Sequence, residues 1–485
     1  MYKKIGVTIL LTTLVAACNS DSTDEDDGNP QAKTAVINLT TSRVGASGDI
    51  VDLNNDGKMD LIVGAPEAKP SSEKTGAALI YLDYKNNPAT TVDSYLTGES
   101  DGDYYGFSYA DIGDVNGDDI NDYALGAINA EGDAVISGAA YVYEGGAYPP
   151  RLLAKLNGEN AFDKFGFAIT GGDVNGDGIS DAIVTAPYTF HDEFQAGAVY
   201  VYFGGSDFSD KPDVVIQGDK INASVGKAVA TGDVNGDGIA DILMDGHAKV
   251  FIYYGGADLK TRIENDMTPD VKIRSDGCCH GGSGFGYTIA YPGDVDGDGF
   301  GDIVIGNPRR SAATVYDNAG SFYIFKGGDD LPSEFFESVV ERRIVKIASS
   351  VANDRFAESV KVLPDVDGNG TVDFLIGAKW ADNGESLITG NVYLFHGEDL
   401  RVDDPSVELT VSAANKAFPQ NKSSAEYGSF VASDAQSVFV GSPGSNKHDG
   451  SVELKDLLNG GSDVIVAQHD HSEHSDDEHA AHGHH

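Results

Sequence analysis

Six short segments of the chain carry acidic and amide side chains at one recurring spacing. Each segment has Asp at position 1, Asp or Asn at positions 3 and 5, and Asp at position 9. Alternate residues of a tightly turned loop can direct their oxygen atoms toward one point, where a hard divalent cation prefers oxygen ligands. The segments begin at Asp52, Asp114, Asp173, Asp233, Asp294 and Asp365.

The predicted ligands in each segment are the four side chains at positions 1, 3, 5 and 9 and the backbone carbonyl at position 7. At least three carboxylates crowd each segment, so a bound cation would relieve their mutual repulsion. The predicted ligand residues are Asp52, Asn54, Asp56, Lys58 and Asp60; Asp114, Asn116, Asp118, Ile120 and Asp122; Asp173, Asn175, Asp177, Ile179 and Asp181; Asp233, Asn235, Asp237, Ile239 and Asp241; Asp294, Asp296, Asp298, Phe300 and Asp302; and Asp365, Asp367, Asn369, Thr371 and Asp373.

Calcium is the cation that this set favours, because every ligand is an oxygen atom and the segments contain no His or Cys. Up to six calcium ions are therefore predicted. Position 6 is Gly, which permits a turn with positive φ, except for Asp119 in the second segment. Position 12 is apolar in all six, which excludes EF-hands. The fifth segment, with four carboxylates, is expected to fill first.

The segments are the most regular part of a longer repeat. Their starts are 59 to 71 residues apart, and short β-branched and aromatic runs separated by turn residues lie between them. The third unit illustrates the four expected strands, at residues 167–171, 182–185, 198–203 and 213–216. A seventh unit has no acidic segment. We therefore predict an all-β, seven-bladed β-propeller of four-stranded blades with calcium loops, over residues 34–468.

The repeat resembles the FG-GAP repeat of integrin alpha-subunit propellers. The Phe-Gly element is present at Phe165-Gly166 and Phe285-Gly286, and the Gly-Ala-Pro element at Gly64-Ala65-Pro66. The resemblance implies that an N-terminal strand, residues 35–39, completes the last blade, and residues 463–466 compete for that place. It also implies that the acidic loops line one face of the propeller and that ligands bind the other.

The N-terminus has the order of a bacterial lipoprotein signal. A basic start and an apolar run lead through small residues to Cys18. We predict a signal peptide at residues 1–17, lipidation of Cys18 and an acidic tether over residues 18–33. The chain would then be anchored by lipid at the outer membrane or cell surface. An ordinary secretory signal with an incidental Cys is the alternative.

Charge excludes one class of partner. The chain has 33 Lys and Arg against 77 Asp and Glu, a formal net charge of −44, so neither nucleic acid nor an anionic membrane surface is an electrostatic partner. No Gly-x-Ser-x-Gly, His-Glu-x-x-His or phosphate-binding glycine loop is present, so no enzyme activity is predicted.

Two further clusters of reactive side chains lie outside the repeat pattern. Cys278 and Cys279 are adjacent and precede His280, so a vicinal disulfide is predicted, with free thiols or a metal site as alternatives. Residues 469–485 contain seven of the twelve His residues among acidic ones, a composition that binds zinc or another transition metal. A disordered polar tail with incidental metal affinity is equally compatible with this composition.

The favoured function is binding or adhesion to an extracellular protein or glycan ligand, by the resemblance to integrin propellers. An enzyme acting on an extracellular polysaccharide or phosphoester near the central channel is one alternative, and metal capture by the His-rich tail is another. The aromatic and Arg residues expected on the ligand face are Tyr104, Phe162, Tyr188, Phe190, Trp380, Phe418, Arg309 and Arg310.

Overall fold

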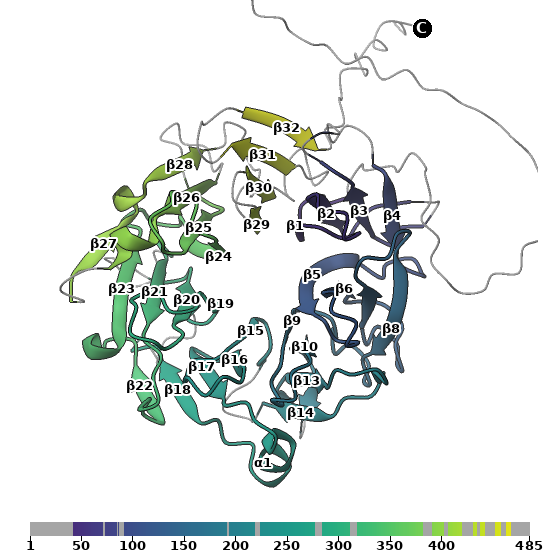
Figure 1. The fold of residues 1–485 in the computed structure, drawn as a ribbon, viewed down its shortest axis with the longest axis horizontal. Helices are drawn as coiled ribbons and strands as arrows, with labels where there is room; N and C mark the ends of the chain where they lie inside the picture. The colour runs from purple at the N-terminus through teal and green to yellow at the C-terminus, as the bar shows by residue number, and fades with distance from the viewer. Residues whose placement is uncertain are drawn as a thin grey trace, which may run out of the picture.

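The chain forms a ring of β-sheets around a central channel (Figure 1). The first strand of each sheet lies nearest the centre of the ring, and the later strands lie progressively further out (Figure 1). This computed structural model describes residues 42–70, 73–84, 86, 92–191, 194–218, 224–276, 284–310, 318–381, 390–401, 406–419, 430–433, 437–441, 452–456 and 462–466.

Three blades with the loop-bearing repeat come first, and in each the strands pair antiparallel with their neighbours. The strands are β1 (Gly48–Val51), β2 (Asp60–Ala65), β3 (Ala77–Tyr81) and β4 (Ser94–Thr97); β5 (Tyr105–Gly113), β6 (Asp122–Ala127), β7 (Ala139–Glu144) and β8 (Arg151–Asn157); and β9 (Ile169–Gly172), β10 (Asp181–Ala186), β13 (Ala198–Tyr202) and β14 (Val214–Gln217). The third blade also has a hairpin of β11 (Phe190–His191) and β12 (Phe194–Gln195).

Three more loop-bearing blades follow. Their strands are β15 (Val229–Gly232), β16 (Asp241–Gly246), β17 (Lys249–Tyr253) and β18 (Val271–Arg274); β19 (Thr288–Ala290), β20 (Ile303–Asn307), β21 (Ser321–Phe325) and β23 (Arg343–Ala348); and β24 (Phe356–Leu363), β25 (Asp373–Ala378), β26 (Asn391–Phe395) and β28 (Lys416–Pro419). The second and third strands of the blades are almost entirely buried, because sheets stack on both of their faces.

Two of these six blades have a fifth strand. The connection between the third and fourth strands of the fifth blade forms β22 (Glu334–Phe336), which pairs parallel with β18 of the preceding blade. The corresponding connection of the sixth blade forms β27 (Glu408–Thr410), which pairs parallel with β23. These additions cover the backbone groups of an outer edge strand, which would otherwise be left without a partner.

The prediction of seven blades of four strands each therefore needs correction. Six loop-bearing blades extend from β1 to β28, and two of them have five strands. After them the chain forms a four-stranded sheet without an acidic loop, from β29 (Phe430–Ser433), β30 (Ser437–Gly441), β31 (Val452–Asp456) and β32 (Ser462–Val466). The uniform repeat inferred from spacing missed the fifth strands because they come from long connections that carry no repeat motif.

The preferred assignment of the strand that completes the last sheet is also wrong. Residues 35–39 lie outside the described residues, and β32 pairs with β31 in the place predicted for them. A hairpin between segments that follow one another closes a short loop, whereas an N-terminal strand would have to close a loop of several hundred residues. The competing segment, residues 463–466, is the one that forms the strand.

The Phe-Gly and Gly-Ala-Pro elements meet where neighbouring blades pack. A Cβ atom added to Gly126 of the second blade would lie 2.1 Å from the Gly166 carbonyl oxygen of the third. Gly64 has the same relation to Gly106, and Gly441 to Gly45, which brings the last sheet against the first blade. The motif glycines thus allow the backbones of adjacent blades to approach more closely than any side chain would permit.

Helices are few among the described residues, as the sequence predicts. They are α1 (Leu259–Asn265) and the 3-10 turns η1 (Val340–Arg342), η2 (Gly397–Leu400) and η3 (Val411–Ala413). Within the part of the chain that the structure describes, no helix is long and apolar enough to cross a membrane.

Candidate functional site

The six acidic segments are the loops between the first and second strands of the six loop-bearing blades, so they open on one face of the ring. The predicted ligands at positions 1, 3 and 5 lie in the loop itself. The aspartate at position 9 begins the second strand or directly precedes it, and it is fully buried in all six blades: Asp60, Asp122, Asp181, Asp241, Asp302 and Asp373.

The buried aspartate joins three strands of its blade. In the third blade, Asp181 Oδ2 accepts a hydrogen bond of 2.8 Å from the Val174 N–H, in the loop that follows the first strand. Its Oδ1 accepts one of 2.9 Å from the Gly204 N–H, just beyond the third strand. The other five aspartates make the same pair of bonds, with distances between 2.7 and 3.2 Å.

Backbone N–H groups shape the rest of each loop around its carboxylates. Asp173 accepts hydrogen bonds from the N–H groups of Gly176, Asp177 and Gly178, and Asp177 Oδ1 accepts one from Ile179. Position 6 has positive φ in every loop, including 70° at Asp119, so the predicted turn conformation is confirmed. Position 4 also has positive φ in all six loops, which was not predicted from the sequence.

Burial opposes ionisation of the position 9 carboxyl in the first five loops. It raises the pKa of Asp181, Asp241 and Asp302 to about 7, and that of Asp60 and Asp122 to about 6. The loop carboxylates at positions 1, 3 and 5 add a smaller upward shift of the pKa by repulsion. A cation in the loop would reverse both effects, so the arrangement fits the predicted oxygen ligand set.

The fifth loop has a basic partner that the sequence analysis missed. Asp294, Asp296 and Asp302 bring carboxylate oxygens within 4.8 Å of one another. Lys326, the first residue after β21, forms an ion pair with Asp296 and lies 3.9 Å from Asp298. Lys326 therefore neutralises part of the negative charge of this loop. The expectation that the fifth loop fills first counted only the loop carboxylates, and it stays a prediction.

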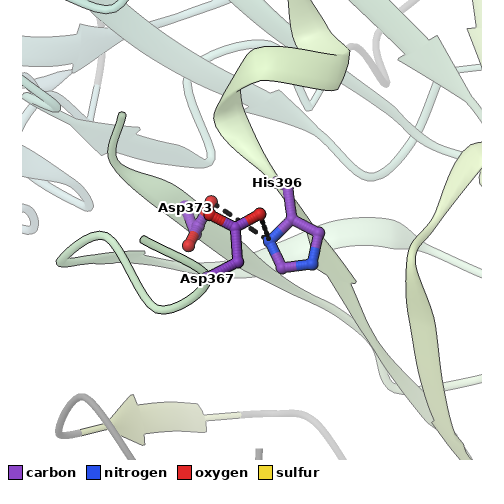
Figure 2. Close-up of side chains that lie close together, drawn as sticks. All are labelled: Asp367, Asp373 and His396. Carbon is purple, nitrogen blue, oxygen red and sulfur yellow. Dashed lines mark hydrogen bonds and ion pairs between the residues drawn. The ribbon is translucent and has the colours of Figure 1, made fainter. Parts of the chain in front are cut away.

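The sixth loop has a histidine at the corresponding place. His396, the first residue after β26, directs Nδ1 toward Asp367 Oδ2 at 3.1 Å and toward Asp373 Oδ1 at 3.4 Å (Figure 2). His396 was not predicted from the sequence, because it lies 23 residues after Asp373. Its position directly after the third strand, matching Lys326 in the preceding unit, is the signal that could have identified it.

Basic and aromatic side chains gather on the opposite face, at the fifth and sixth blades. The Arg355 guanidinium lies over the Trp380 ring, 3.8 Å from its centroid. Glu358, which is buried, pairs with Lys379 at 2.7 Å and with Arg355 at 3.7 Å. Arg309 is exposed and lies nearby, since Arg309, Arg355 and Glu358 all act electrostatically on Tyr287. We call Arg309, Arg355, Lys379 and Trp380 the basic-aromatic cluster.

The other residues predicted for this face have mixed outcomes. Phe162 and Phe190 are exposed, at 56% and 55% of their surface. Arg310 pairs with the buried Glu337. Phe418 does not belong there, because it lies on β28 and packs into the core with Val392 and Leu394. Cys18, Cys278, Cys279, His280 and residues 469–485 lie outside the described residues.

The central channel, where the enzyme alternative would place its site, contains a cavity of about 400 Å³. Its charged lining residues are Asp49, Asp111 and Lys361. Lys361 pairs with Asp49 at 2.7 Å, joining the sixth blade to the first, and Asp111 accepts hydrogen bonds from Asn121 and Gly113. These charges are engaged in contacts within the ring, so the described part of the channel adds no support for catalysis.

Comparison with known proteins agrees with the sequence motifs. The FG-GAP repeat model matches residues 44–81, 165–202 and 285–325. Integrin alpha-PS5 of Drosophila melanogaster is 30% identical over 37% of this chain and 18% of its own length, and integrin alpha-4 of Xenopus laevis is 26% identical over 60% and 27%. The chain thus spans only a minor part of these relatives. A solved structure of BBS1N in complex with ARL6DN has a TM-score of 0.44 at 9% identity, covering 88% of this chain and 94% of that one. The repeat matches and the integrin relatives support an integrin-like FG-GAP propeller.

Proposed function

We propose that this protein is a calcium-binding, lipid-anchored propeller at the cell surface that binds an extracellular protein. The observation that carries the binding function is the basic-aromatic cluster, held in place by the buried Glu358 on the face opposite the acidic loops. The similarity to integrin alpha subunits supports the same conclusion. A glycan ligand and a propeller enzyme remain the alternatives.

The sign of the cluster indicates the chemistry of the partner. The chain has a net charge of −44, yet Arg355 and Lys379 lie here around one buried carboxylate, with the single Trp beside them. Arg and Trp are frequent anchors of protein interfaces, since both combine a large contact area with directional bonding. A protein that presents carboxylates and an apolar side chain fits this surface.

The calcium part of the proposal is supported by the six loops. Each brings several carboxylates together on a turn fixed by backbone bonds, and the residue at position 9 is buried where an unpaired charge is costly. A cation bound in each loop would neutralise charges that otherwise repel. Its role would be structural, and the ligand face would be held indirectly through the blades.

Calcium is expected to raise the melting temperature of the full chain relative to chelator, since a ligand absent from the unfolded chain stabilises the folded one. Each site occupied at about 100 times its Kd adds about 2.7 kcal/mol. Thermal melting followed by circular dichroism measures this. Asp177→Asn should reduce the calcium-induced rise, whereas Asp210→Asn, an exposed aspartate outside the loops, should leave it unchanged. Equal midpoints with calcium and with chelator would refute the structural calcium role.

Lys326→Met is expected to tighten calcium binding at the fifth loop, because Lys326 competes for Asp296 and Asp298. The gain should be about two- to fivefold, since a partly exposed ion pair contributes about 0.5–1 kcal/mol. Calcium titration by calorimetry measures it. Lys346→Met, which removes the ion pair with Glu408 on the outer strands of the same blade, is the control. Unchanged affinity in Lys326→Met would show that Lys326 does not compete.

Arg355→Ala and Trp380→Ala are each expected to weaken binding to the protein partner by about tenfold or more, as interface anchors do. An array of extracellular proteins probed with the purified chain in calcium identifies partners, and surface plasmon resonance gives the affinities. Arg151→Ala, which removes an exposed arginine paired with Glu144 on the rim, is the control. Equal affinities of all three variants, or binding on a parallel glycan array only, would contradict the proposal.

Cys18→Ser is expected to move the protein from the membrane fraction to the soluble fraction, because it removes the proposed lipid attachment site. Metabolic labelling with a fatty acid and membrane fractionation test this. Cys278→Ser changes a different cysteine and should retain both label and membrane association. Identical fractionation of wild type and Cys18→Ser, without label in either, would show that the anchor is absent.

A further inference from the structure

His396 makes the sixth loop chemically different from the other five. The residue directly after the third strand is Leu82, Phe203, Tyr254, Lys326 or His396 in five of the six blades, and the equivalent residue of the second blade is Glu144, the last of β7. At this place Lys326 reaches Asp296 and His396 reaches Asp367, both at position 3 of their loops. Two blades therefore show independently that a side chain here points into the loop, and only the imidazole among these six can ligate a metal through nitrogen.

The distances around His396 match those of a compact metal site. Nδ1 lies 3.1 Å from Asp367 Oδ2 and 3.4 Å from Asp373 Oδ1, and the three donor atoms lie within 4.8 Å of one another (Figure 2). Ligands about 2.1 Å from a zinc ion are about 3.4 Å apart in a tetrahedron and about 3.0 Å in an octahedron. The two separations between Nδ1 and the carboxylate oxygens fall in this range.

The remaining loop side chains hold the turn through hydrogen bonds from the backbone. Asp365 accepts hydrogen bonds from the N–H groups of Gly368, Asn369 and Gly370, as Asp173 does in the third loop. Asn369 Oδ1 accepts from Thr371. Asp367 Oδ1 accepts from the Asn369 N–H, and Asp373 accepts from Val366 and Gly397. Asp367 Oδ2 and Asp373 Oδ1 are the oxygens that face the imidazole. Asp373 Oδ1 also accepts the Gly397 N–H, and its second lone pair can coordinate a cation.

An ion pair of His396 satisfies only one of the two carboxylates that face it. Nδ1 carries at most one hydrogen, so it can direct a hydrogen bond to only one of the two carboxylates at a time. The side chain of Asp373 is fully buried, while those of Asp367 and His396 are 26% and 19% exposed, so the group has one enclosed side and one open to solvent. A cation entering from the open side would contact all three donors.

We propose that Asp367, Asp373 and His396 form a mixed nitrogen–oxygen site for a borderline divalent cation of the Zn²⁺ class, in preference to calcium. Imidazole nitrogen suits Zn²⁺ and similar transition metals, whereas calcium requires six to eight oxygen ligands. The inference rests on the proposal that the loops bind divalent cations, and it assigns a different cation to one of them.

Co²⁺, which reports nitrogen and oxygen ligands by its visible absorption, tests the site in the full chain with calcium present in excess. Wild type is expected to bind one more equivalent of Co²⁺ than His396→Ala. Any Co²⁺ that His396→Ala still binds at this site should bind at least tenfold more weakly, and Zn²⁺ should displace the additional Co²⁺ from wild type. The His-rich tail is present in every variant, so its contribution cancels in the difference. His247→Ala, which removes an exposed imidazole from the turn between β16 and β17, should behave as wild type.

Equal Co²⁺ titrations of wild type and His396→Ala would overturn the proposal, as would displacement of the additional equivalent by calcium as readily as by Zn²⁺. Asp367→Asn, which keeps the imidazole, should lose the same equivalent and decides the matter where His396→Ala does not fold. Calcium-dependent melting of the same proteins reports on the other five loops. If calcium does not change the melting temperature of wild type, the calcium proposal is refuted. If wild type and His396→Ala bind Co²⁺ equally, only the mixed site is refuted.

Discussion

The buried aspartate at the end of each acidic loop is the interaction on which the loop-bearing blades depend. One carboxylate binds the chain leaving the first strand and the chain leaving the third, while its own residue begins or directly precedes the second. A carboxylate can do this without water only where backbone N–H groups and a nearby cation compensate its desolvation. The same residue thus fixes the geometry of the blade and is stabilised by a positive charge on one face of the ring.

Two of the six blades place a nitrogen-bearing side chain against the acidic loop. In the fifth, the Lys326 ammonium reaches into the loop, and in the sixth the His396 imidazole does. Both follow the third strand, so a position outside the repeated motif changes the chemistry of a loop geometry that repeats within the chain. The opposite face has the reverse chemistry, with a buried glutamate surrounded by cations and a Trp. One face of the ring is therefore suited to cations and the other to anionic groups, and packed strands connect the two faces.

Local sequence signals predicted the repeat well, whereas features that depend on contacts between distant segments were not predicted. Positive φ at position 6 followed from the glycines, and the strands of the third unit lie within a few residues of their predicted places. The glycine contacts between blades explain why the motif residues are required. His396 and Lys326 were not predicted because their partners lie 23 to 30 residues away in the sequence. Phe418 was assigned to the surface because a short stretch of sequence does not show which side chains are buried. The fifth strands follow from long connections, whose pairing depends on a neighbouring blade.

The two added strands also change how the ring must come apart. In a simple propeller each blade is made by its own stretch of chain, so one blade can fray while its neighbours stay intact. Here β22 belongs by sequence to the fifth blade but pairs with the fourth, and β27 links the sixth to the fifth in the same way. Pulling one blade outward therefore shears hydrogen bonds of the next, so blades four to six act as a single mechanical unit.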